Sequence, residues 1–166
     1  MKNTCLLIAI LFISVSAIAQ PQIPHDYEAL SKVADQYFEA YSSLDAKAMI
    51  TFYHDDINYI DETYIDNKGE TADLKGKKEI EEAFSTQFFP IAKKFTFDEK
   101  ERFFSGNQGV FRGVITVHYK GSVAGADDSK TLVWSTNYTM VLTFKDGKII
   151  RQNDFVNYTG AKQEWQ

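Results

Sequence analysis

The sequence has 166 residues and a formal net charge of −5, and 44% of its residues are hydrophobic, with 13 phenylalanines and 9 tyrosines among them. This length is enough for one domain with a sizeable core. No block of lysine or arginine is present, which argues against a nucleic-acid partner and against binding to an anionic membrane surface. The single cysteine excludes a disulfide within the chain.

The first 19 residues, MKNTCLLIAILFISVSAIA, have the pattern of a secretory signal peptide. One lysine precedes an apolar run from Cys5 to Ile13, and the small residues around Ala19 form a cleavage site. The apolar run is shorter than the about 20 residues that a membrane-spanning helix needs. We therefore expect export to the periplasm or the medium after cleavage near Ala19. The mature chain would begin at Gln20, with 17 basic residues against 23 acidic residues and a net charge of −6.

The first half of the mature chain is predicted to be mainly helical. Residues 20–26 form a leader that contains proline, and Asp26 is a candidate helix cap. From residue 27 to 44, apolar and aromatic residues recur at three- and four-residue spacing, which indicates an amphipathic helix. A short second helix follows Asp45, then a short strand, a polar loop over 65–75 and a third helix over 76–93, in which Pro90 should end or kink the helix.

The second half is predicted to be all strand. Strands over 95–104 and 110–119 are separated by the turn GNQG, and a long strand follows over 131–144. The tetrapeptide KDGK at 145–148 indicates a hairpin to a last strand over 149–158. Helices followed by a meander of strands indicate an α+β fold, with three helices packed on one face of a curved antiparallel sheet. We expect one domain over residues 27–160 and a C-terminal tail over 161–166.

Several of these segments resemble the nuclear transport factor 2-like superfamily, and within it the SnoaL-like and ketosteroid isomerase branch. The resemblance is carried by VADQYFEAYSSLD, FYHDDINYID, GKKEI and TFKDGKIIRQNDF, and it spans roughly residues 27–158. It implies a cone-shaped fold with an internal pocket. Its motifs specify the fold far better than the activity, because this fold carries enzymes as well as binding modules.

The resemblance also implies positions for an acid–base site. Alignment with the ketosteroid isomerases puts Tyr37 at their oxyanion-hole tyrosine and Asp61 at their catalytic base. The position of their protonated aspartate falls at or near Met140, which cannot donate a hydrogen bond to an enolate. Loss of one such donor costs about 10² or more in rate, so steroid isomerisation by the same residues is not expected.

Asp61, Tyr37 and Asp154 are the candidate catalytic residues. Asp61 ends the row Ile57, Tyr59, Asp61, so it is either a general base in an apolar pocket or a strand-end residue bonded to the following loop. Tyr37 belongs to an aromatic helix stripe and is either a pocket donor or core. Asp154 shares strand parity with Gln152 and is either a second pocket carboxylate or a residue at the rim.

The inner parity of the strands supplies the expected pocket wall. Besides the three candidates it contains Tyr59, Phe111, Ile115, Val117, Trp134, Tyr138, Met140 and Gln152. No histidine pair stands at a ligand spacing, so we expect neither a metal nor a cofactor. The opposite face of the 131–144 strand is semi-polar and β-branched, and the resemblance implies that such a face forms a homodimer.

Two functions stay open at this point. The chain is either an exported pocket for a small apolar molecule without chemistry, or a cofactor-independent isomerase, cyclase or hydrolase. In the second case Asp61 would be the general base, Tyr37 or Tyr138 would donate a hydrogen bond to the substrate, and Asp154 would be a second acid–base or orienting group.

Overall fold

The computed structural model describes residues 26–166. The predicted signal peptide over residues 1–19 lies outside this part of the chain. None of the helices within it is long and apolar enough to cross a membrane. The helices and strands of the described chain are α1 (Tyr27–Ser42), α2 (Ala46–Ile50), β1 (Tyr53–Asp61), α3 (Ile65–Lys68), β2 (Ala72–Lys75), α4 (Gly76–Ala83), β3 (Ala92–Ser105), β4 (Gln108–Lys120), β5 (Thr131–Lys145), β6 (Lys148–Val156) and β7 (Lys162–Trp165).

The helices begin where the sequence offers caps. The side chain of Asp26 accepts a hydrogen bond from the backbone N–H of Ala29, and Asp45 does the same for Ala48, both at 3.0 Å. Inward-facing residues of α1, among them Ala34, Tyr37 and Ala40, are buried. The periodicity of the sequence therefore predicts the buried face of this helix correctly.

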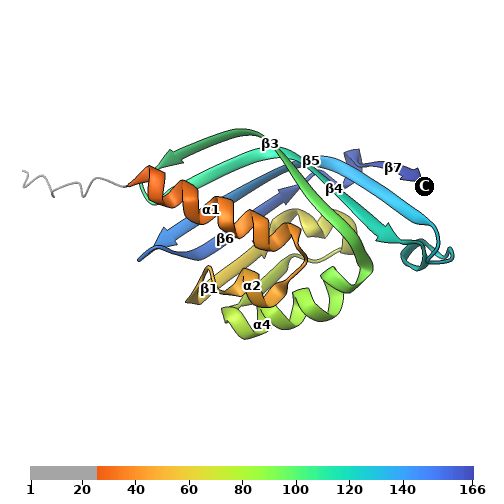
Figure 1. The fold of residues 1–166 in the computed structure, drawn as a ribbon, viewed down its shortest axis with the longest axis horizontal. Coiled ribbons are helices and arrows are strands. Elements are labelled where there is room, and N and C mark those ends of the chain that lie inside the picture. The colour runs from red at the N-terminus through yellow and green to blue at the C-terminus, as the bar shows by residue number, and fades with distance from the viewer. Residues whose placement is uncertain (1–25) are drawn as a thin grey trace, which may run out of the picture.

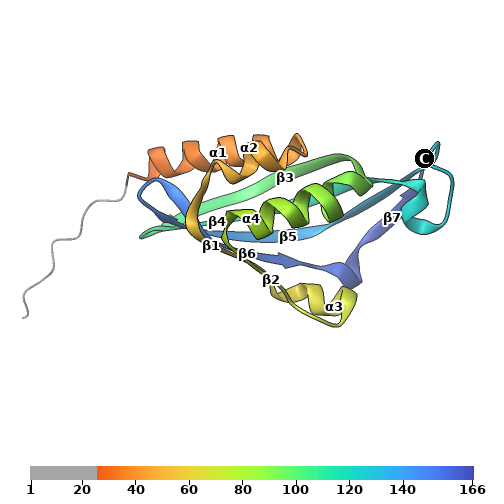
Figure 2. The same cartoon turned by 90° about the horizontal axis from the view of Figure 1, so that it is seen from below.

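The strands form one sheet in the order β2-β1-β6-β5-β4-β3. All neighbours are antiparallel except β1 and β6, which run parallel. The sheet curves, and α1, α2 and α4 lie on one of its faces (Figures 1 and 2). This confirms the α+β fold, with helices packed on a curved, mostly antiparallel sheet.

A break between β6 and β7 shapes one end of the sheet. Strand β6 pairs with β5 along Tyr138–Lys145, and β7 pairs with the same edge of β5 along Leu132–Ser135. Between them the chain leaves the sheet in a short 3-10 turn, η5 (Tyr158–Gly160). The tail expected over 161–166 is therefore mostly a sheet strand, because the edge of β5 beyond β6 offers it unpaired backbone groups.

Two further segments differ from the expectation. The polar stretch 65–75, predicted as a loop, contains α3 and β2, because β2 pairs with β1 from Asn58 to Asp61. The third helix is regular only to Ala83 and continues as a π-helical segment, η2 (Phe84–Phe88), and a 3-10 turn, η3 (Phe89–Ile91). The homodimer through the outer sheet face stays a prediction, since the structure contains one chain.

Candidate functional site

A cavity of about 130 Å³ lies between the helices and the inner face of the sheet. Its wall is mainly aromatic and aliphatic, and its polar atoms come from two carboxylates, tyrosine hydroxyls and one indole. None of the lining residues is a lysine, arginine or histidine. The lining residues are Tyr41, Leu44, Tyr59, Asp61, Tyr64, Ala72, Phe84, Phe88, Phe89, Ile91, Ala92, Phe95, Ile115, Val117, Tyr119, Trp134, Tyr138, Asp154, Val156 and Tyr158.

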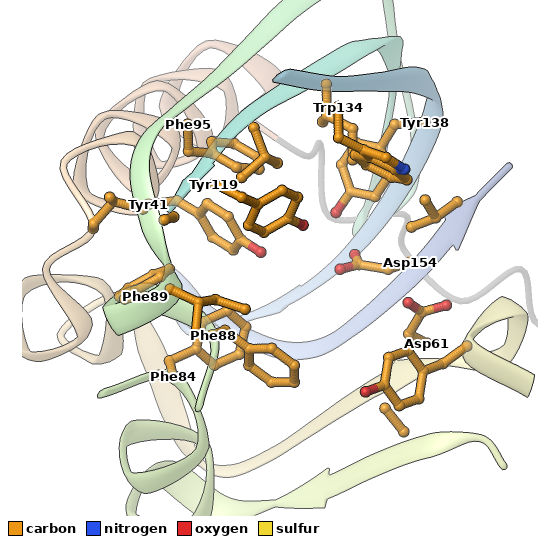
Figure 3. Close-up of a pocket in the computed structure, with 18 of the residues that line it drawn as sticks. Tyr41, Asp61, Phe84, Phe88, Phe89, Phe95, Tyr119, Trp134, Tyr138 and Asp154 are labelled. Atoms are coloured by element: carbon orange, nitrogen blue, oxygen red, sulfur yellow. The ribbon is translucent and has the colours of Figure 1, made fainter. Parts of the chain in front are cut away.

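The π-helical segment builds one side of this cavity. The backbone N–H of Phe89 bonds to the carbonyl of Phe84, the five-residue step of a π-helix. This wide turn lets Phe84, Phe88 and Phe89 pack as one cluster on the cavity, with ring centroids 5.1 Å apart for Phe84–Phe88 and for Phe84–Phe89 (Figure 3). The regular helix predicted from sequence does not provide for this arrangement.

The two carboxylates of the wall lie side by side. In the parallel pairing of β1 with β6, Asp61 is the direct partner of Asp154. Both are only 3% exposed, and both point toward the cavity (Figure 3). Because the two groups lie on adjacent strands, the charge of Asp61 acts on the proton affinity of Asp154.

Asp61 is held by three hydrogen bonds. One carboxylate oxygen accepts from the backbone N–H and the hydroxyl of Thr63, at 3.0 and 2.6 Å, and the other accepts from the hydroxyl of Tyr158 at 2.6 Å. The Thr63 hydroxyl in turn accepts from the backbone N–H of Val156 at 2.8 Å, which ties the site to β6. Asp61 is thus both a strand-end residue that caps the following turn and a carboxylate of the pocket wall.

Asp154 has a different environment. Burial raises its pKa from 3.8 to about 7, and the neighbouring charge of Asp61 contributes to the rise. Hydrogen bonding from Tyr138 and Gln152 works in the opposite direction. The side-chain amide of Gln152 donates to the two oxygens of Asp154 at 3.0 and 3.2 Å. A carboxyl group that titrates near neutral pH is suited to take up and release a proton.

Behind Asp154 lies a buried polar network. The carbonyl oxygen of Gln152 accepts hydrogen bonds from the hydroxyls of Tyr37 and Tyr53, at 2.6 and 2.8 Å, and the two hydroxyls are 2.9 Å apart. All three side chains are fully buried. This network orients the amide so that its N–H groups face Asp154.

The predicted site residues divide into two groups. Those that lie on the cavity are Asp61, Asp154, Tyr59, Ile115, Val117, Trp134 and Tyr138. Tyr37, Gln152, Phe111 and Met140 do not reach it, contrary to the expectation. They lie deeper in the core, where Phe111 packs against Phe38 and Tyr37 bonds to Gln152. The inner parity of a strand identifies the face correctly, but only part of that face borders the cavity.

Several tyrosines of the cavity wall are not among the predicted site residues. Tyr41, Tyr119 and Tyr158 line the cavity, and each continues a pattern that the sequence shows. Tyr41 belongs to the stripe of α1, Tyr119 shares parity with Val117, and Tyr158 shares parity with Asp154. In the described part of the chain, no group of three or more histidine, cysteine, aspartate or glutamate side chains could hold a metal ion.

Comparison with known proteins now places the chain in a family. The model of the SnoaL-like domain matches residues 34–152. The chain belongs to the SnoaL-like domain family. No curated protein sequence matches it significantly.

Solved structures share the fold of this SnoaL-like domain at low identity. A protein from Shewanella denitrificans, named as a SnoaL-like polyketide cyclase, is 20% identical with a TM-score of 0.66, over 78% of this chain and 91% of that one. TerC, co-crystallised with polyporic acid, is 15% identical with a TM-score of 0.63, and the match covers 79% of this chain and 93% of TerC. A third structure is a Catenulispora acidiphila protein with a ketosteroid isomerase-like fold, in complex with trimethylamine. It is 15% identical with a TM-score of 0.60, and the match covers 74% of this chain and 83% of that one.

Proposed function

We propose that this SnoaL-like domain binds a small, largely apolar ring molecule in its aromatic cavity, and that Asp154 exchanges a proton with a carbon atom of that molecule without a cofactor. The observation that carries the proposal is the position of Asp154, which is buried on the cavity wall beside a second carboxylate. The family and the names of the fold relatives support a small-molecule ligand and cyclase or isomerase chemistry.

The environments of the two carboxylates suggest different roles. Asp61 accepts three hydrogen bonds, from Thr63 and Tyr158, which fix its carboxylate at the end of β1. Asp154, with a pKa of about 7, can both take up and release a proton at neutral pH. This assigns the general base to Asp154, whereas the resemblance to ketosteroid isomerases points to Asp61.

The proposed step conserves atoms and charge. The Asp154 carboxylate takes a proton from a carbon next to a carbonyl group, and the electron pair of the C–H bond moves into the carbonyl to leave an enolate. The neutral Asp154 then returns the proton, either to the same carbon or to another carbon of the conjugated system. The apolar wall keeps water away from the enolate and so favours the return of the proton from Asp154.

Deuterium exchange tests this step without knowledge of the natural substrate. Cyclohexanone in D₂O should incorporate deuterium beside its carbonyl faster with the wild-type protein than without it, as followed by NMR. The rate should rise with pH through about 7, because only the ionised form of Asp154 accepts a proton. Asp154→Asn should lower the rate by about 10² or more, as loss of a general base does.

A matched control is Asp98→Asn, which changes an exposed carboxylate on β3 that pairs with Lys100. It should leave the exchange rate unchanged. If cyclohexanone binds but Asp154→Asn exchanges as fast as the wild type, the proton-transfer role is wrong and the domain is a binding module. If no single-ring compound binds, the proposed cavity function itself fails.

A further inference from the structure

We propose that the hydroxyls of Tyr41 and Tyr119 form a donor pair that holds the oxygen atom of a neutral, single-ring ketone in reach of Asp154. This inference rests on the proposed function and names its substrate class. It assigns a binding role to two residues for which neither the sequence pattern nor the family comparison provides one.

Two tyrosines reach the cavity from different elements of the fold. Tyr41 comes from α1 and Tyr119 from β4, and both line the cavity. Figure 3 shows their hydroxyls directed into the same space that the Asp154 carboxylate faces. A ligand in that space would lie between a proton acceptor and two potential proton donors.

The hydroxyls of Tyr41 and Tyr119 have no partner in the part of the chain that the structure describes. Within residues 26–166, neither hydroxyl makes a hydrogen bond to another residue. In the same part of the chain, the only fully enclosed side-chain polar atom without a partner is the oxygen of Asn58. The hydroxyls of Tyr41 and Tyr119 are therefore open to the cavity, where a ligand or water satisfies them.

Tyr41, and not Tyr37, is the residue of α1 whose hydroxyl can bind a ligand. The hydroxyl of Tyr37 is committed to Gln152 at 2.6 Å, in a fully buried position away from the cavity. Tyr41 follows four residues later on the same face of α1, and its ring packs edge-on against Tyr37 at 6.0 Å between centroids. The helix thus presents one tyrosine to the core network and the next to the cavity.

Both hydroxyls remain donors over the physiological pH range. Burial raises the pKa of Tyr41 well above its ordinary value of 10, with the nearby charge of Asp154 adding to the rise. Burial also raises the pKa of Tyr119 to about 12. Protonated phenols can donate hydrogen bonds to a carbonyl oxygen, and more strongly to the enolate oxygen that forms from it.

Charge and size restrict the ligand further. Two carboxylates and no cationic side chain line the cavity, so a carboxylate, sulfate or phosphate group on the ligand would be repelled. The volume of about 130 Å³ is close to that of an apolar cavity of about 150 Å³ that holds one benzene molecule. These properties fit a neutral ligand with one ring inside the cavity.

The test compares two isosteric probes, cyclohexanone and methylenecyclohexane, which lacks the oxygen. Dissociation constants are measured by ligand-observed NMR for the wild type, Tyr41→Phe, Tyr119→Phe and the double variant. Each single variant should weaken cyclohexanone binding by roughly 3- to 10-fold, the equivalent of one hydrogen bond, and leave methylenecyclohexane unchanged. Tyr27→Phe, at the far end of α1 and stacked on Phe104, is the matched control and should change neither constant.

The outcomes separate this inference from the proposed function. If cyclohexanone binds and exchanges deuterium but both Tyr→Phe variants bind it as the wild type does, the donor pair is wrong while the role of Asp154 stands. Benzoate, measured in the same way, is the anionic probe, and if it binds more tightly than cyclohexanone the neutral ligand class is overturned. If both probes bind, the tyrosine variants weaken only cyclohexanone and no exchange occurs, the donor pair stands and the proton-transfer role fails.

Discussion

Replacement of Gln152 by leucine tests the buried network behind Asp154. The substitution removes the acceptor of two hydrogen bonds, from Tyr37 at 2.6 Å and from Tyr53 at 2.8 Å. The two hydroxyls are 2.9 Å apart and can bond to each other, so one O–H group remains unsatisfied in the core. An unsatisfied buried donor costs about 1–3 kcal/mol.

The same change also removes the amide that donates to Asp154 at 3.0 and 3.2 Å. Because that hydrogen bonding lowers the pKa of Asp154, its loss raises the pKa further and costs about 1 kcal/mol more. Leucine and glutamine have similar volumes, so the substitution leaves little empty space in the core and adds little to the loss of stability. We therefore expect Gln152→Leu to lower the free energy of unfolding by about 2–4 kcal/mol.

Urea unfolding at pH 7 measures this loss as a lower midpoint with an unchanged slope. The decisive comparison is the triple variant Tyr37→Phe, Tyr53→Phe, Gln152→Leu, in which apolar groups replace every member of the network except Asp154. It should recover stability to within about 1–2 kcal/mol of the wild type, because no tyrosine hydroxyl remains to be satisfied. Gln108→Leu, at an exposed position, is the control and should stay within about 0.5 kcal/mol.

Two results would refute this reasoning. One is a loss of less than about 0.5 kcal/mol for Gln152→Leu, which would mean that the network contributes no net stability. The other is a triple variant whose loss equals the sum of the three single losses, since independent residues add and members of one network do not.

Two further predictions concern pH and the N-terminus. The pKa of Asp154 is about 7 in the folded chain against 3.8 for a free aspartate, so the folded state retains a proton that the unfolded state releases. Its contribution to the free energy of unfolding should therefore fall as pH rises from about 4 to about 7. Asp154→Asn should flatten that part of the urea-midpoint profile, and an unchanged profile would contradict the assignment. Expression of the full sequence in a bacterium should yield an exported chain that begins at Gln20, as read by N-terminal sequencing, whereas a chain that retains Met1–Ala19 would contradict the predicted signal peptide.

The site shows where prediction from sequence reaches its limit. Alternation of apolar residues correctly placed Asp61 and Asp154 on the inner face of their strands, because side-chain direction in a strand depends only on parity. Parity does not show how far along each strand the cavity extends. Met140 and Phe111 share the inner face but lie in the core away from the cavity, whereas Trp134 borders the cavity.

The amino-acid sequence by itself determined the fold class, the main helices and the long strands in their order, and the side of each strand that faces inward. These follow from local periodicity, caps and turns, which act within a few residues of each other. Only the tertiary structure decided that Asp61 lies beside Asp154, because the parallel register of β1 and β6 joins segments about 90 residues apart. It also decided that Tyr37 serves the core while Tyr41 faces the cavity, since that depends on how α1 packs against the curved sheet.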